Sequence, residues 1–423
     1  MIIKLELENI GPYTEKVTLD FRVNKKDKSS SGTIYTLPDG EMITKVAGII
    51  AGNAYGKSTI LKALNSIGSF INNPIVNKEM KNYMEKIKEE EIRNYLKEWG
   101  TLSLLPVNKS GNKVGMINVE MYIDSNNDYT GYYIYTLKYD NNYLKNGVVE
   151  EKLTFKKKYN SKIEKEILSI KNNQVSEIGH KIAYKTNYLN ELVGKVKNVF
   201  IEKMNYYETF YNRYIMESST LGAENYIFPE EYLIEQIGEN KNLVKKFINL
   251  ADSEIKDIEI DISDENNEKL FFVYDNYKLR YSSISTATKK LCGIATNFSK
   301  ASKKGGVFLI DELDNSFNKN ISDFIIKIYD TNIINNTSQI IFTTNTSDVL
   351  SNLRRDQIFI IQKNEKANSI IKYLNFVDPE TNKRSRKDWS FVKAYNENVI
   401  KNFPKEKDIA NLISYIKNNK EDK

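Results

Sequence analysis

A loop of glycine, lysine and hydroxyl residues is the first stretch of this sequence whose spacing could do chemistry. It runs Ala51-Gly52-Asn53-Ala54-Tyr55-Gly56-Lys57-Ser58-Thr59. In the pattern G-x-x-x-x-G-K-[ST], backbone N–H groups surround phosphates, the lysine reaches the outer phosphates and the hydroxyl binds Mg²⁺. We therefore predict that residues 53–59 bind ATP, with Lys57 on the β- and γ-phosphates and Ser58 on Mg²⁺.

Ala51 departs from this pattern, because it replaces the first glycine. Alanine does not adopt a positive φ as readily as glycine does. A chance match in an ordinary strand–turn–helix is the alternative interpretation. The intact run from Gly56 to Thr59, between an apolar strand and an amphipathic helix, favours the phosphate loop.

Two carboxylates follow an apolar run much later in the chain. Val307-Phe308-Leu309-Ile310 reads as a buried strand, and Asp311-Glu312 comes directly after it. At a strand end, Asp311 would lie near the Mg²⁺ held by Ser58. Glu312, one residue further, would orient or deprotonate the attacking water. The alternative is a pair of surface acids at a strand exit, but the phosphate loop upstream favours a joint site.

The elements that must position these residues follow from hydrophobic periodicity. Residues 2–10 and 17–21 predict strands, and residues 46–50 predict a buried strand ahead of a helix that runs from Thr59. Two more apolar strands, at 307–310 and 339–344, have a helical segment between them. This β-α-β order is typical of a mostly parallel sheet that is covered on both faces.

The remaining segments are assigned from the same patterns. Three alternating stretches within residues 115–155 predict an antiparallel meander. Residues 160–250 are mixed and mostly helical, so we expect an insertion. Strand character returns after Lys256, followed by a helix from Thr286, and the last forty-odd residues predict a helical tail.

Composition points to an ordinary soluble protein. The chain has 423 residues, of which 40% are apolar and 28% charged. A single cysteine, Cys292, rules out an intramolecular disulfide and suits a reducing compartment. There is no apolar stretch of transmembrane length and no signal-peptide run at the start, so we expect no membrane contact and a cytoplasmic protein. The net charge of +6 is mild and allows nucleic acid as a partner without arguing for it.

Other chemistries find little support. One cysteine and one histidine, His180, cannot build a zinc site or a nucleophile–histidine–aspartate triad with a supporting motif. A metal nuclease built on clustered carboxylates stays open. However, the acidic residues after Asn345 are scattered rather than gathered at a strand end: Asp356, Asp378, Glu380 and Asp388.

Several stretches of the sequence resemble a known group of ATPases. They are LENIGPY near the start, GNAYGKSTILKAL, FLIDELDNSF, and QIIFTTNTSDVL ahead of LRRDQIFII. These resemble the ABC-type heads of structural-maintenance and DNA-repair ATPases. They resemble more closely the compact AAA/ABC-like ATPases of bacterial abortive-infection and other anti-phage systems. The resemblance covers residues 1–70 and 250–365.

The resemblance implies an α/β fold: an ABC-type P-loop NTPase head with a mixed β-sheet flanked by helices, an antiparallel β subdomain and a mostly helical insertion. The implied division has four parts. They are lobe I with the phosphate loop and the meander (1–158), the insertion (159–250), lobe II with the signature and the acidic pair (251–365), and the tail (366–423).

The resemblance also implies two further site residues. The family's signature matches Ile284-Ser285-Thr286-Ala287-Thr288, so Ser285 would contact the γ-phosphate bound by a partner subunit. Both signature glycines are missing, and a simple helix N-cap is the alternative. The family's γ-phosphate-sensing histidine matches Asn345, which can hydrogen-bond a phosphate oxygen or the water but carries no charge. The glutamine that ends lobe I in such heads, or its substitute, is expected within residues 115–155.

The departures at Ala51, the signature and Asn345 suggest slow or partner-gated hydrolysis of ATP. The implied function is an ATPase that forms a homodimer or higher homo-oligomer around ATP and controls a separate toxin or nuclease effector in anti-phage defence. One alternative is a DNA-repair or chromosome-type ATPase that clamps nucleic acid, although residues 71–105 and 160–250 lack the sustained heptads of long arms. Another is a nucleotide-dependent scaffold without useful hydrolysis.

Overall fold

The computed structural model describes the greater part of the chain. The described residues are 1–23, 32–52, 54–72, 105–108, 114–124, 130–141, 149–171, 174–177, 230–238, 240–261, 269–304, 306–315, 317–330, 337–364 and 369–373. Three predictions lie wholly or partly outside these residues: the place of Asn53, the insertion over residues 178–229 and the tail beyond 373. None of the described helices is long and apolar enough to cross a membrane.

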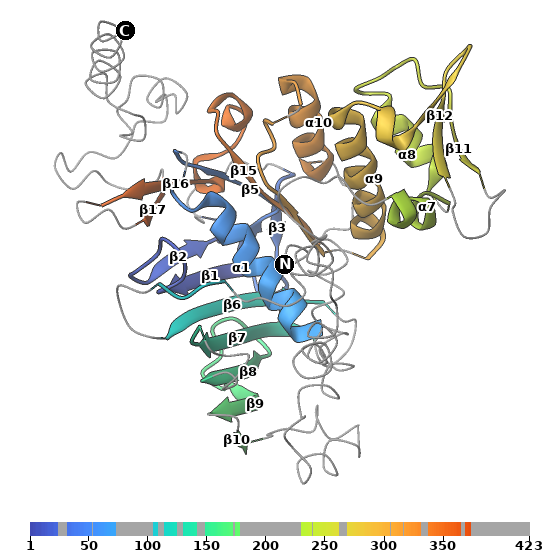
Figure 1. The fold of residues 1–423 in the computed structure, drawn as a ribbon. Helices are drawn as coiled ribbons and strands as arrows, with labels where there is room; N and C mark the ends of the chain where they lie inside the picture. Colours follow the sequence, from blue (N-terminus) through green and yellow to red (C-terminus); the bar gives the residue numbers. More distant parts are fainter. Residues whose placement is uncertain are drawn as a thin grey trace, which may run out of the picture.

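A seven-stranded sheet forms one side of the molecule (Figure 1), with the order β10-β9-β8-β7-β6-β1-β2 and antiparallel pairing throughout. The predicted meander is confirmed, and the two N-terminal strands join it. The strands are β1 (Ile2–Glu8), β2 (Val17–Asp20), β6 (Gly115–Ile123), β7 (Gly131–Tyr139), β8 (Glu150–Lys156), β9 (Lys165–Lys171) and β10 (Gln174–Glu177).

Alternation along the strands of this sheet separates an apolar face from a polar one. In β7, Tyr133, Tyr135 and Leu137 are buried, whereas Thr136 and Lys138, which alternate with them, are half-exposed. Because successive side chains of a strand point to opposite faces, this period of two explains why the segment forms a half-buried strand. The buried face, rich in tyrosine, belongs to the larger hydrophobic core.

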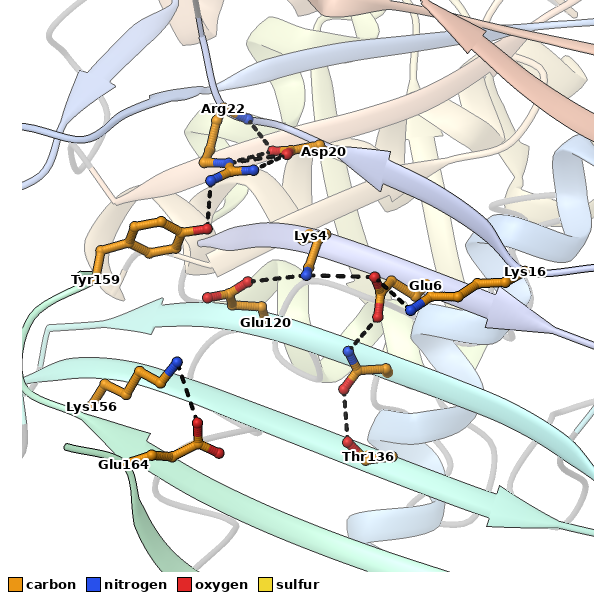
Figure 2. Close-up of polar contacts among 11 residues, drawn as sticks. Lys4, Glu6, Lys16, Asp20, Arg22, Glu120, Thr136, Lys156, Tyr159 and Glu164 are labelled. Carbon is orange, nitrogen blue, oxygen red and sulfur yellow. Dashed lines mark hydrogen bonds and ion pairs between the residues drawn. The ribbon is translucent and has the colours of Figure 1, made fainter. Parts of the chain in front are cut away.

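Ion pairs and hydrogen bonds cover the other face of the sheet (Figure 2). The ammonium of Lys4 lies 3.5 Å from a carboxylate oxygen of Glu6 and 3.7 Å from one of Glu120. Lys16 also reaches Glu6, at 3.1 Å. Further pairs join Arg22 to Asp20, and Lys156 to Glu164. The charged side chains of this polar face are thus paired with one another, both within a strand and, as with Lys4 and Glu120, across neighbouring strands.

A five-stranded sheet occupies the centre, with the order β14-β15-β5-β16-β17. Its first four strands are parallel, and β17 pairs antiparallel with β16. Nearly all their residues are buried, as expected for parallel strands covered on both faces. The strands are β5 (Val46–Ile50), β14 (Gly306–Ile310), β15 (Ser338–Thr344), β16 (Ile358–Lys363) and β17 (Ser369–Tyr373).

The central sheet divides two hydrophobic cores. Side chains of one parity, such as Ile49 and Leu309, pack with helix α1 (Lys57–Asn72) and the seven-stranded sheet. Side chains of the other parity, such as Ile50 and Phe308, pack with the remaining helices. Those helices are α7 (Glu230–Gly238), α8 (Lys241–Ile248), α9 (Thr286–Lys304) and α10 (Lys319–Asp330). Figure 1 shows α1 lying across the seven-stranded sheet, with α9 and α10 beyond the central sheet.

Small elements complete the described fold. A three-stranded antiparallel sheet lies beside α7 and α8, and a short hairpin precedes β5. The strand character predicted after Lys256 and the helix predicted from Thr286 are confirmed. The elements are β3 (Ile34–Thr36), β4 (Met42–Thr44), β11 (Asp257–Asp261), β12 (Lys269–Val273), β13 (Lys278–Arg280) and the 3-10 helices Tyr281–Ser283, Asp348–Leu350 and Arg355–Gln357.

Two segments that we expected to be helical contain strands. Within 159–250, α7 and α8 are helices, but β9 and β10 extend the seven-stranded sheet past residue 158, because their backbones pair with β8 and with each other. In the expected helical tail, residues 369–373 form β17, because this short apolar stretch completes the edge of the central sheet. The division of the chain into two lobes stays a prediction.

Candidate functional site

The phosphate loop connects β5 to α1, as predicted. Ala51 is buried and is not among the described residues with a positive φ, so its replacement of glycine causes no backbone strain. Gly56 has a φ of +100°, and a Cβ there would lie 2.6 Å from Pro12 and 3.0 Å from the Tyr13 hydroxyl. Gly56 is therefore required both by backbone conformation and by space.

Lys57 is the first residue of helix α1, and its side chain reaches back into the phosphate loop. Its ammonium donates to the carbonyl oxygens of Ala51, at 2.9 Å, and Gly52, at 3.3 Å. Burial lowers the pKa of Lys57, and the carboxylates of Glu312, Asp311 and Asp314 act against that lowering. The lysine is thus a buried cation inside the loop, within electrostatic reach of the acidic residues after β14.

The N-terminal segment after β1 packs against the phosphate loop. The hydroxyl of Tyr13 donates to the carbonyl oxygen of Gly56, at 2.9 Å. Gly11 has a φ of +53°, and its carbonyl accepts a 2.7 Å hydrogen bond from the Asn108 side chain. The LENIGPY stretch, which entered the sequence analysis only through a resemblance, therefore packs against the phosphate loop.

Asp311 lies at the end of β14, only 5% exposed. Its carboxylate accepts hydrogen bonds from the hydroxyls of Ser58 and Thr343. Burial raises the pKa of Asp311, and these two hydrogen bonds partly offset the rise. The structure thus brings together the two residues that we predicted as metal ligands, Ser58 and Asp311, because the parallel strands β14 and β5 end at the same edge of the sheet.

Glu312 has an unusual backbone conformation, and hydrogen bonds fix the position of its side chain. Its φ of +49° lies in the left-handed region, which costs a residue other than glycine roughly 1–3 kcal/mol. Its N–H donates to the Thr343 hydroxyl at 2.8 Å. One carboxylate oxygen accepts from the amide of Asn315 at 3.0 Å, and the other from the amide of Asn345 at 3.4 Å.

Asn345 follows β15 and is tied to the acidic loop. Its N–H is 3.2 Å and 3.1 Å from the two carboxylate oxygens of Asp314. Its side-chain amide donates to Glu312, whereas its buried Oδ1 has no hydrogen-bond partner among the described residues. An amide oxygen accepts hydrogen bonds only, so its partner must be a donor such as water rather than a phosphate oxygen.

Ser285 lies at the start of α9 and is exposed. Its hydroxyl oxygen accepts from the N–H of Thr288 at 3.1 Å and lies 2.8 Å from the Thr288 hydroxyl. This is the geometry of a helix N-cap. The contacts described for Ser285 thus stay within its own helix, and it joins neither the phosphate loop nor the acidic pair there.

Some participants were not predicted. Thr343 joins both acidic residues, and Lys290 on α9 lies close to the acidic loop. Thr343 could have been suspected from its place at a strand end, but nothing in the sequence distinguishes Lys290 from Lys289. The glutamine expected within 115–155 does not occur there, since that stretch contains none.

The site suits a cation that takes most of its ligands from phosphates and water, as Mg²⁺ does. The structure supplies one hydroxyl and one carboxylate in contact, Ser58 and Asp311. Within the described part of the chain, no group of three or more histidine, cysteine or acidic side chains could hold a metal by itself. The unpartnered acceptor of Asn345 belongs to the same side chain whose amide donates to Glu312.

Comparisons with known structures give a remote likeness. The "SMC head domain from Thermotoga maritima" is 11% identical, with 88% of this chain and 98% of that chain covered and a TM-score of 0.39. The "SmcHead bound to the C-winged helix domain of ScpA" is 12% identical, with 93% and 99% covered and a TM-score of 0.44. A Pyrococcus furiosus Smc head with an extended coiled coil is 11% identical, with 94% and 98% covered and a TM-score of 0.42.

A family model gives a more local match. Residues 146–344 match the model described as "AAA domain, putative AbiEii toxin, Type IV TA system". The matched range contains α9, Asp311 and Glu312, and the phosphate loop lies before it. No curated protein matches the chain. Residues 146–344 are thus similar to an AAA-type ATPase domain. The phosphate loop follows β5 and the acidic pair follows β14 of the same parallel sheet, which is the arrangement of a P-loop NTPase fold.

Proposed function

We propose that this protein binds Mg²⁺–ATP between the phosphate loop and the acidic pair and hydrolyses it slowly. In this proposal it forms a homodimer or larger homo-oligomer around the nucleotide and controls a separate toxin or nuclease effector in anti-phage defence. The observation that carries the ATP site is the hydrogen bond between Ser58 and Asp311, with Lys57 and Glu312 next to it.

Phosphate binding is assigned to the loop and Lys57. The ammonium of Lys57 bonds to the carbonyls of Ala51 and Gly52. Phosphate oxygens carry more negative charge than carbonyls, so charge-assisted hydrogen bonds to them favour release of these two contacts. Ser58 and Asp311 would hold Mg²⁺, which supplies neutralisation of the phosphate charge.

Water activation is assigned to Glu312 and Asn345. Glu312 carries the carboxylate that would take the proton, and Asn345 presents an acceptor oxygen without a partner among the described residues. Two acceptors side by side fix both hydrogens of one water, which orients its lone pair for attack. Asn345 thus acts on the water in this proposal, and not on the γ-phosphate.

Dimerisation through Ser285 is supported by its position. The residue is exposed at the N-terminus of the 19-residue helix α9, where backbone N–H groups and the helix dipole favour a phosphate. The N-cap contact uses the serine oxygen as an acceptor from the Thr288 N–H. The Thr288 hydroxyl lies 2.8 Å away, and when that hydroxyl donates to the serine oxygen, the serine hydrogen is left to donate to a phosphate. A nucleotide held by a second copy of the chain is the partner that we propose.

The defence role is supported by the description of the matching family, which names a putative toxin of a Type IV toxin–antitoxin system. A DNA-clamping role would need cations free to meet phosphates. On the polar face of Figure 2, Lys4, Lys16, Arg22 and Lys156 each lie within 4 Å of a carboxylate. This pairing of the cations with carboxylates favours the defence role over the DNA-clamping role.

The experiment that tests the proposal combines phosphate release with ATP-dependent oligomerisation of the purified protein. Lys57→Ala should abolish both, and Glu312→Gln should abolish turnover and trap the ATP-bound oligomer. A wild type that neither binds nor hydrolyses ATP would contradict the proposal. If Glu312→Gln behaves like the wild type, a nucleotide-dependent scaffold replaces the ATPase. For the defence role, cells that carry the gene and its neighbours should resist phage, and Lys57→Ala should remove that resistance.

A further inference from the structure

Lys290 is a buried cation that has no role in the ATP hydrolysis proposed above. It lies in the second turn of α9 and is 6% exposed. Its ammonium lies 3.5 Å from the carbonyl oxygen of Asn315, in the loop that follows the acidic pair. Burial lowers the pKa of Lys290, and the charges that act against this lowering are Glu312 and Asp311.

The neighbouring lysine on the same helix has a different environment. Lys289 donates to the carbonyl of Ser282 at 2.7 Å, and its ammonium lies 5.5 Å from the centre of the Tyr281 ring. Lys290, one residue on, lies about 100° further around the helix and faces the acidic loop instead. Burying an ammonium costs several kcal/mol unless opposite charges and acceptors compensate it. The acidic loop supplies that compensation.

The contacts of Lys290 connect two parts of the site. Ser285 lies five residues earlier on α9, about 7.5 Å along the axis, so the helix joins the two side chains rigidly. On the other side, Asn315 offers its carbonyl to Lys290 and its side-chain amide to the Glu312 carboxylate, at 3.0 Å. The helix backbone thus connects Ser285 to Lys290, and side-chain contacts run on from Lys290 through Asn315 to Glu312.

We propose that Lys290 is a positioning residue that fixes the acidic loop, and through Asn315 the carboxylate of Glu312, to helix α9. A second subunit that contacts the helix at Ser285 would then set the position of Glu312, which makes hydrolysis depend on assembly. This inference rests on the proposed ATPase function and adds the way in which the partner gates it.

Lys290→Met keeps the length of the side chain and removes the charge. We expect kcat for ATP to fall about 10- to 100-fold, since a small displacement of a catalytic group has effects of this size. The KM for ATP should stay within about twofold, because the phosphate loop is intact. ATP-driven assembly should also persist, so the variant should resemble Glu312→Gln. In the wild type the rate per subunit should rise with protein concentration, and in Lys290→Met it should not.

Three companion variants make the test specific. Lys290→Arg keeps the charge and should restore most of kcat, whereas Lys290→Gln keeps a donor without charge and should fall between the two. Lys319→Met is the control: its ammonium lies 3.4 Å from Asp323 and 3.4 Å from the Ser351 hydroxyl, so it should match the wild type. If Lys290→Met does not fold, Lys290→Gln carries the same comparison of kcat with KM.

The inference is wrong if Lys290→Met and Lys290→Gln keep wild-type kcat. It is also wrong if both lose assembly and ATP affinity in step with kcat, since that pattern indicates general damage. Failure of the proposed function looks different. In that case the wild type itself shows no ATP turnover, whereas failure of this inference alone leaves a wild type that is active and assembly-dependent.

Discussion

The hydroxyl of Thr343 donates its hydrogen to the carboxylate of Asp311. The same hydroxyl oxygen accepts the N–H of Glu312 at 2.8 Å. Thr343 is fully buried in β15, next to β14, so one side chain fixes both acidic residues at the end of the neighbouring strand. This residue therefore links the proposed metal ligand to the proposed base.

Replacement of Thr343 tests this link. Thr343→Val keeps the shape but leaves a buried carboxylate oxygen and a buried N–H without this partner, which should destabilise the fold by about 1–3 kcal/mol. We expect kcat to fall about tenfold as Glu312 loses its backbone anchor. Urea unfolding and phosphate release measure the two effects. Thr343→Ser retains the hydroxyl and should recover most of both; equal losses in the two variants would contradict the role of the hydrogen bond.

Asn345 gives a second prediction. If its free Oδ1 accepts a hydrogen from the attacking water, Asn345→Ala should lower kcat about 100-fold and leave the Kd for ATP nearly unchanged. Asn345→Asp keeps an acceptor but adds a charge beside Glu312 and Asp314, and repulsion should lower activity as well. Single-turnover phosphate release and binding of a fluorescent ATP analogue separate the two quantities. A large rise in Kd would instead assign Asn345 to the phosphate.

The hydrogen bond between Tyr13 and the phosphate loop gives a third prediction. Tyr13→Phe removes the hydrogen bond to the carbonyl of Gly56 and should cost about 1 kcal/mol of stability. ATP affinity should fall several-fold, because the loop loses a fixed point. Tyr159→Phe is the control, since it removes a hydroxyl that bonds to Arg22 on the polar face. Equal ATP affinity in the two variants would show that Tyr13 does not shape the loop.

The polar face predicts a pH effect through Glu120. Burial raises the pKa of Glu120 above its ordinary value, with Lys4 acting against the rise. Between the ordinary pKa and the raised one, the folded state binds more protons than the unfolded state, so stability falls as pH rises through that window. Glu120→Gln lacks this loss. The melting temperature of Glu120→Gln, measured from pH 4 upward, should therefore rise relative to that of the wild type as the pH increases.

Glu164 is the matched control of opposite sign (Figure 2). Burial works to raise the pKa of Glu164, but the ammonium groups of Lys156 and Lys152 act against it, and the pKa is lowered overall. The charged form is thus favoured in the fold, and its contribution is present above the ordinary pKa and lost as pH falls through the lowered one. Glu164→Gln should lose stability relative to the wild type at neutral pH. If both variants shift in the same direction, the assignment of the two environments is wrong.

The sequence predicts the parts of the site that depend on local patterns. The phosphate loop and the acidic pair each follow a short, wholly apolar strand, and such strands can be recognised without knowing their neighbours. Parallel order then predicts that Ser58 and Asp311 meet. The roles of Thr343 and Lys290 cannot be predicted in this way. The role of Thr343 depends on which strand pairs with β14. The role of Lys290 depends on which of two neighbouring lysines on α9 faces the acidic loop.

The errors in the fold have a similar cause. Residues 165–171 (KEILSIK) have too short an alternation to separate a strand from a helix, and their partner β8 decides the outcome. Residues 369–373 become a strand because the edge of β16 offers hydrogen bonds. The pairing of β1 with β6 links segments more than a hundred residues apart, which no local pattern reveals.

The position of β5 in the central sheet has a consequence for synthesis of the protein. Strand β5 lies between β15 and β16, which are made near the other end of the described chain. While the chain is still emerging from the ribosome, β5 therefore has neither of its partners, and the loop after it has no fixed shape. Long-range pairing of this kind is slow to form. A nascent copy cannot assemble the site between the phosphate loop and the acidic pair until residues 338–363 have been translated, so this site forms late in synthesis.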